Sequence, residues 1–194
     1  VSRLLPELAL KDLLEKVGMG DRSEVIKQPM EETFRYLERT QKPNGLYSYW
    51  PGSRGYVSLT AYVTEFLLAA KEQGYKFPEA FLTKAIKSLQ ESLRSDYSQF
   101  IDGESFTERV EALYALARAG DFQEAYAQDF LARATAMNLY SEAKILATFL
   151  DSQPENQQAV KRLSDDLWKS LIFKLREGQE VYHGLQYRAD SWGG

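Results

Sequence analysis

Apolar residues recur along most of the chain at the three- and four-residue spacing of an amphipathic α-helix. In the tail, Val181, Leu185 and Tyr187 instead follow a shorter period punctuated by glycine, which predicts a small β-hairpin near residues 180–188. The fold class expected is therefore all-α with one short hairpin. The predicted helices cover residues 4–14, 28–40, 56–71, 78–94, 108–119, 122–134, 139–150 and 159–173.

Two kinds of helix alternate along the chain. The segments 56–71, 108–119 and 141–150 are rich in alanine and other small or apolar residues, whereas the segments between them keep a polar face. A helix without a polar face is buried on most sides. This alternation predicts a two-layer array of antiparallel helical hairpins, either a solenoid or a ring closed on itself. The unequal spacing disfavours strict tetratricopeptide or HEAT repeats.

Local signals refine the ends of these elements. Pro29 suits the first position of a helix, and Ser105 with Glu108 fits a capping box. Residues 42–45 read Lys-Pro-Asn-Gly, which is a strong turn signal. Residues 46–50 then alternate as a β-strand does and contain three aromatic side chains, Tyr47, Tyr49 and Trp50.

Composition limits the chemistry available. The 194 residues are 44% hydrophobic with a net charge of −4, which supports a sizeable core and argues against a nucleic-acid partner. We expect a single domain over residues 1–194. The absence of cysteine and the single histidine exclude disulfides, a thiol nucleophile and cysteine- or multi-histidine metal sites. No catalytic triad or carboxylate pair can be argued from spacing, so we expect no enzyme, no metal and no cofactor.

A longer motif carries a family resemblance. Residues 41–50 read Gln-Lys-Pro-Asn-Gly-Leu-Tyr-Ser-Tyr-Trp, and residues 59–63 read Leu-Thr-Ala-Tyr-Val. Together they resemble the thioester domain of the alpha-2-macroglobulin and complement family, which is an α/α toroid. Residues 107–119 resemble the next inner helix of that ring. Residues 1–6 resemble the stretch that follows the Cys-x-Glu-Gln-Thr motif in bacterial members.

The resemblance implies a role in trapping proteases. In that family an internal thioester between Cys and Gln side chains is kept dry until a protease cleaves a bait region, and a lysine of the protease then attacks it. It implies a bacterial protease inhibitor whose partners are target proteases and neighbouring macroglobulin domains. It also implies a full-length protein in the periplasm, anchored to the inner membrane as a lipoprotein.

The chain departs from the family at the reactive centre, because residues 1–194 contain no Cys. Either the chain begins just past the motif, which the opening residues favour, or the protein belongs to a branch without a thioester. The family's ring needs roughly six helical pairs and about four are expected here. The fold expected is thus a partial toroid, whose hydrophobic edges we expect to be filled by dimerisation or swapping.

Four residues are candidates for shielding a thioester or for contacting another domain: Tyr47, Tyr49, Trp50 and His183. Large aromatic side chains exclude water well, although they could equally close one end of the helical array. Complement relatives use a histidine as acyl acceptor in the loop that matches residues 97–101. No histidine lies there, so the resemblance implies direct attack by an amine. The other interpretation of His183 is a surface residue of the hairpin.

Two other classes of function stay open. Terpenoid cyclases and protein prenyltransferases are toroids as well, and Asp165-Asp166 is a candidate for their acidic motif. Adjacent aspartates point in different directions on a helix, and both the spaced aspartate cluster and the zinc set of those enzymes are missing. A helical scaffold that binds peptides on a concave face is the other alternative.

Overall fold

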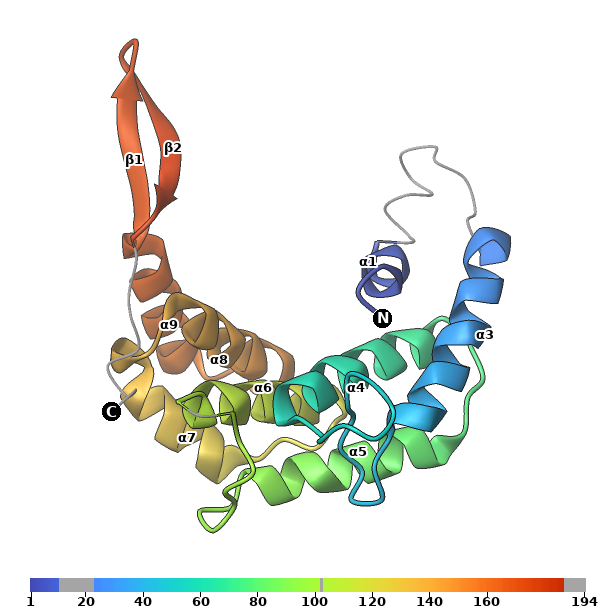
Figure 1. Cartoon of the computed structure of the whole chain (residues 1–194). Coiled ribbons are helices and arrows are strands. Elements are labelled where there is room, and N and C mark those ends of the chain that lie inside the picture. Colours follow the sequence, from blue (N-terminus) through green and yellow to red (C-terminus); the bar gives the residue numbers. More distant parts are fainter. Residues whose placement is uncertain (11–22, 102, 187–194) are drawn as a thin grey trace. The chain divides into compact units, whose positions relative to one another are not determined.

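The computed structural model describes residues 1–10, 23–101 and 103–186, and it confirms a mainly helical fold with one antiparallel β-hairpin (Figure 1). The chain divides into two compact units, Val1–Gln99 and Phe100–Gly194. A single domain over the whole chain stays a prediction, and so does a ring. No helix in the described ranges combines the length and the apolar character needed to cross a membrane.

The first unit is built around a helix that is buried on most sides. Its helices are α1 (Leu4–Ala9), α3 (Ser23–Thr40), α4 (Val57–Glu72) and α5 (Glu79–Ser92). Helix α4 packs against α5 and α1, and no residue of α4 before Lys71 is exposed. The expectation from its all-round apolar sequence is confirmed. Residues 11–14 of the predicted first helix lie outside the described residues.

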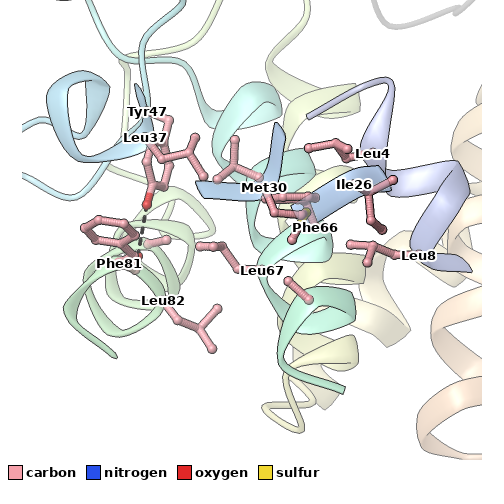
Figure 2. Packing of buried hydrophobic residues seen from close by; sticks show 13 residues of the cluster. Leu4, Leu8, Ile26, Met30, Leu37, Tyr47, Phe66, Leu67, Phe81 and Leu82 are labelled. Atoms are coloured by element: carbon pink, nitrogen blue, oxygen red, sulfur yellow. Dashed lines mark hydrogen bonds between the residues drawn. The ribbon is translucent and has the colours of Figure 1, made fainter. Parts of the chain in front are cut away.

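The core of this unit draws on every one of its described helices and on the loop before α4 (Figure 2). Phe66 and Leu67 of α4 are fully buried between Met30 of α3 and Phe81 of α5. Phe34 extends the packing, with its ring centroid 5.3 Å from that of Phe77. Burying a side chain of this size contributes about 1.5–3 kcal/mol, so the contact of α4 with its neighbours stabilises the unit.

Helix α3 starts earlier than predicted, and Pro29 lies inside it rather than at its first position. An internal proline removes one backbone hydrogen bond and crowds the preceding turn, which costs about 3 kcal/mol. Ile26, one turn before Pro29, is buried in the core cluster. Packing of this extra turn against the core offsets the free-energy cost of the internal proline. Local helix propensity does not include this tertiary contribution.

The second unit repeats the alternation of small-residue and polar helices. It contains α6 (Ser105–Arg118), α7 (Glu124–Arg133), the 3₁₀ turn η1 (Ala134–Ala136), α8 (Leu139–Ser152) and α9 (Gln157–Lys169). Helix α8 packs against α6, α7 and α9. Helix α6 buries seven residues, whereas α7 and α9 bury two each. The predicted division into buried helices and helices with one solvent-exposed polar face is confirmed in this unit.

The capping box predicted at Ser105 does not form. Helix α6 already includes Ser105, and Glu104 precedes it without a side-chain cap. Glu108 is buried, and its Oε2 accepts a hydrogen bond of 2.8 Å from the backbone N–H of Ile101. The Glu108 carboxylate therefore reaches past the helix end and supplies an acceptor to a partly buried N–H of the loop.

The hairpin begins earlier than predicted. Helix α9 ends at Lys169, and the strands are β1 (Leu171–Arg176) and β2 (Gln179–Leu185). Glu177 and Gly178, both at positive φ (53° and 80°), form the two-residue turn that favours such a hairpin. The prediction that a helix continues to residue 173 is wrong. Leu171, Phe173 and Leu175 follow the two-residue period of a strand, which the apolar run through Phe173 obscures in the sequence.

A turn after α3 docks directly on α5. Gly45 has φ +89°, and its N–H donates to the carbonyl of Lys42 at 2.9 Å. The Ser88 hydroxyl on α5 donates to the carbonyl of Asn44. A Cβ added at Gly45 would overlap the Lys84 carbonyl and the Ser88 Oγ, so only glycine lets the turn approach the helix this closely.

Replacing Gly45 by Ala is expected to lower the free energy of unfolding by about 2–4 kcal/mol, because left-handed backbone strain adds to the overlap with α5. Gly52→Ala is the matched control, since Gly52 also has positive φ (+86°) but a Cβ there meets nothing within 4 Å. The control is expected to lose about 1 kcal/mol. Urea denaturation followed by circular dichroism measures both, and equal losses would contradict the close approach.

Candidate functional site

The loop between α3 and α4 is held by a short ladder of backbone contacts. Tyr47 forms isolated antiparallel bridges to Gln41 and to Tyr56, so the loop is extended at this residue. The alternation predicted over residues 46–50 is wrong, because Leu46, Tyr47 and Ser48 are all buried whereas Tyr49 and Trp50 are both exposed. The N–H of Tyr56 donates to the carbonyl of Tyr47 at 2.9 Å. The N–H of Tyr47 donates to Thr60 Oγ1 at 2.8 Å, and that hydroxyl donates to the carbonyl of Tyr56 at 2.7 Å. The loop is thereby fastened to the first turn of α4.

Tyr47 points into the core of the first unit and has no exposed surface (Figure 2). Its hydroxyl donates to the carbonyl of Phe81 at 3.5 Å, and the Gln41 side-chain amide donates to the same carbonyl at 2.8 Å. Burial raises the pKa of the Tyr47 phenol far above its usual range, because the phenolate would lose its hydration. Of the three candidate aromatics in the loop, this one lies inside the protein.

Tyr49 and Trp50 point outward instead, with 51% and 63% of their surface exposed. Their ring centroids are 6.1 Å apart, and the ring of Tyr49 lies 5.3 Å from that of Tyr56. The Tyr36 hydroxyl on α3 donates to the carbonyl of Tyr49. These four residues form a surface that we call the aromatic patch: Tyr36, Tyr49, Trp50 and Tyr56.

Ser48 explains why the side chains of this loop do not alternate between the inside and the outside of the unit. It is buried, and its hydroxyl contacts the carbonyls of both Thr40 and Trp50 at 3.0 Å. Ser48 and Tyr47 are thus both inside, and the next two residues are both outside. Tyr36 and Tyr56 were not singled out from sequence, because only the folding of the loop back onto the end of α3 brings them beside Tyr49.

Two arginine side chains border the aromatic patch. The Arg54 guanidinium lies 4.8 Å from the centroid of the Tyr56 ring, and that of Arg39 lies 5.7 Å from the Tyr36 ring. A guanidinium over an aromatic face is attracted by about 0.5–1 kcal/mol at an exposed site, which favours these orientations of the two rings. The patch is therefore a preordered apolar surface with a polar margin, the kind of surface that proteins use for contacts with other proteins.

His183 lies in the second unit, exposed on strand β2. The pairing register skips it: Tyr182 faces Phe173 and Gly184 faces Ile172, so His183 is the extra residue of a β-bulge. Its expected place on the surface of the hairpin is confirmed. Its role in shielding or in contacting another domain stays a prediction, as do those of Tyr47, Tyr49 and Trp50.

The acidic pair on α9 forms ion pairs along its own helix. Lys161 binds Asp165 at 2.8 Å and Lys169 binds Asp166 at 3.4 Å. The hydrogen bond from Lys161 lowers the pKa of the Asp165 carboxyl. In the described ranges no three His, Cys, Asp or Glu side chains gather as metal ligands would. The interpretation of residues 165 and 166 as a solvated helix face is confirmed.

Comparison with solved structures identifies proteins of the same fold. No family model matches the chain, and no curated protein does. Native alpha-2-macroglobulin of E. coli matches 76% of this chain with a TM-score of 0.63 and 21% identity. Trypsin-activated alpha-2-macroglobulin of E. coli matches 68% with a TM-score of 0.58 and 19% identity. Salmonella alpha-2-macroglobulin reacted with methylamine matches 69% with a TM-score of 0.57 and 20% identity.

These matches show that the chain has a fold found within bacterial alpha-2-macroglobulins. The expected resemblance is thereby confirmed at the level of the fold. The chain spans only about a tenth of the length of those proteins: 10%, 10% and 9% in the same order.

Replacing Tyr47 by Phe is expected to flatten the loss of stability at high pH. Above a pH of about 10 the unfolded phenol ionises while the buried one keeps its proton, so the wild-type protein loses stability as pH rises. Its free energy of unfolding should fall by up to about 1.4 kcal/mol per pH unit more steeply than that of Tyr47→Phe. Urea denaturation between pH 8 and 11 measures this, and parallel curves for the two proteins would contradict it.

Proposed function

We propose that this chain is part of a bacterial alpha-2-macroglobulin-like protease inhibitor, and that it supplies a portion of the thioester domain. The observation that carries the proposal is the shared fold, at a TM-score of 0.63 over 76% of the chain. The ordered loop with its aromatic patch is consistent with it, because the resemblance in sequence centres on residues 41–50. In this proposal the chain is a structural part of a trap and has no enzymatic activity.

The reactive bond of such a trap would be formed outside residues 1–194, which contain no Cys. The Salmonella protein of the same fold reacts with methylamine, a small amine. An activated acyl group that is kept from water stays inert until an amine or water is admitted, which is the chemistry that a covalent trap needs. The chain's contribution is then to bury and position that bond.

The aromatic patch is the surface we assign to this task. Tyr49 and Trp50 are more than half-exposed, and their carbonyls accept hydrogen bonds from the hydroxyls of Tyr36 and Ser48, respectively. Aromatic side chains provide a large contact area for a small loss of rotamer entropy. In the proposed assembly they pack against a neighbouring macroglobulin domain and keep water from the thioester. Association of the isolated chain into dimers, and residence of the full-length protein in the periplasm on an inner-membrane anchor, belong to the same proposal.

Trapping has a signature that ordinary inhibition lacks. Purified full-length protein containing this chain, mixed with trypsin, is expected to suppress cleavage of a large protein substrate by about 10-fold or more while cleavage of a small chromogenic peptide continues. A covalent complex on denaturing gels, prevented by prior methylamine, would place the protein in the thioester branch. Trapping without that complex would place it in the branch without a thioester.

Two outcomes contradict the proposal. Equal loss of cleavage of the large and the small substrate would indicate a blocked protease active site rather than a cage. Unchanged cleavage of both would indicate no inhibition. A protease inactivated at its own active site is the control for the first, since it must lose activity on both substrates together.

Removing the exposed rings should uncover the reactive bond. In a full-length protein that carries the thioester, Tyr49→Ala combined with Trp50→Ala is expected to speed methylamine incorporation before protease cleavage by about 10-fold, which is about 1.4 kcal/mol of lost protection. Tyr140→Ala with Leu150→Ala on α8 is the matched control, since both are similarly exposed apolar side chains. Equal rates for the two variants would contradict the role of the patch.

A further inference from the structure

The hairpin of the second unit has two chemically different faces. Paired residues of an antiparallel ladder share a face, and alternate residues of one strand share a face. Phe173 pairs with Tyr182 and Leu171 pairs with Leu185, which places them with Leu175 on a mainly apolar face that also carries Glu180, the partner of Leu175. The opposite face carries the remaining residues of β1, Ile172, Lys174 and Arg176.

The apolar face is exposed. Leu175 and Tyr182 have 73% and 57% of their surface accessible, and Trp168, at the end of α9, has 70%. The rings of Trp168, Phe173 and Tyr182 follow one another at centroid distances of 6.5 and 6.3 Å. Figure 1 shows the hairpin projecting from the end of α9 away from the helices of its own unit. A two-stranded sheet is marginally stable alone, and exposed apolar surface favours binding to another protein surface. The hairpin therefore has the properties of a binding element.

The two edges of the hairpin differ as sites for another strand. Among the described residues the sheet contains β1 and β2 alone, so each strand has one edge without a neighbour. On β2 the bulge at His183 interrupts the ladder, and bulges hinder the pairing of a further strand. Strand β1 has no extra residue and presents a regular edge.

The charges of β1 define what that edge would accept. Lys174 and Arg176 lie two residues apart on one face, and β1 has no acidic residue. Within the described part of the chain neither side chain belongs to an ion pair. Opposite charges on neighbouring strands stabilise a sheet, and like charges destabilise it.

We propose that the open edge of β1 binds an extended segment of another polypeptide in which apolar and acidic residues alternate. The apolar residues would extend the face formed by Phe173 and Leu175, and the carboxylates would lie beside Lys174 and Arg176. Backbone hydrogen bonds supply affinity in such strand addition, and the alternating side chains supply specificity. The inference does not depend on protease trapping.

A second copy of this chain fits the edge less well. Pairing β1 with β1 of another copy would set two Lys174 and two Arg176 side chains along one face, with repulsion among all four. Pairing β1 with β2 of another copy would bring the regular edge against the bulge at His183. The charge pattern thus favours an acidic partner over self-association.

The test uses the 194-residue chain and fluorescent nine-residue peptides, with binding followed by fluorescence anisotropy. A peptide alternating valine and glutamate is expected to bind at least 10-fold more tightly than one alternating valine and lysine. Lys174→Glu with Arg176→Glu is expected to reverse this preference. Lys76→Glu with Lys87→Glu, a matched change of charge at exposed lysines of the first unit, should leave it unchanged.

Two methylated peptides, one for each register, separate strand addition from simple charge attraction. The valine–glutamate peptide with alternate backbone amides methylated keeps its charges but cannot donate along one edge, so its binding should fall at least 10-fold for one of the two methylation registers. Equal binding of the acidic and basic peptides, or full binding by both methylated forms, would overturn the proposal. So would light scattering that shows a dimer dispersed by Lys174→Glu with Arg176→Glu, since the edge would then belong to a second copy.

Discussion

One hydroxyl group connects the features on which the first unit depends. Thr60 Oγ1, fully buried at the start of α4, accepts the N–H of Tyr47 and donates to the carbonyl of Tyr56. It thereby fixes the loop at Tyr47 and at Tyr56 to the most buried helix of the unit. Removing it would leave a buried N–H without an acceptor, which costs about 1–3 kcal/mol. The inward position of Tyr47 follows from this anchor, and the outward positions of Tyr49 and Trp50 follow from it together with the buried hydroxyl of Ser48.

The features that sequence predicts well here are those set by long patterns. The all-round apolar segment 56–71 becomes a helix buried on most sides, and the alternation with polar helices holds in both units. Errors occur where a single local signal competes with packing. Pro29 lies inside α3 because Ile26 packs into the core, and the Ser105 box gives way to a longer reach by Glu108.

The candidate site shows the same division. The loop was found from its glycine and aromatics, but which rings face the protein and which face outward depends on Ser48 and Thr60, whose bonds to residues 40 and 47 are tertiary. Tyr36 joins the patch from α3 for the same reason. Such contacts leave no periodic trace in the sequence, so the residue types were predictable and their directions were not. His183 was placed on the hairpin surface, but its bulge is a property of pairing alone.

The bulge at His183 also bears on how far assembly at this hairpin can proceed. A sheet with two equivalent open edges can add copies head to tail without limit, which is how strand pairing leads to fibres. Here the edge of β1 is regular and that of β2 is interrupted by the bulge. A further copy could therefore pair regularly with β1 but not with β2. In the proposed mode of binding, the hairpin would therefore accept one added strand at β1 and would not support further growth of the sheet at β2.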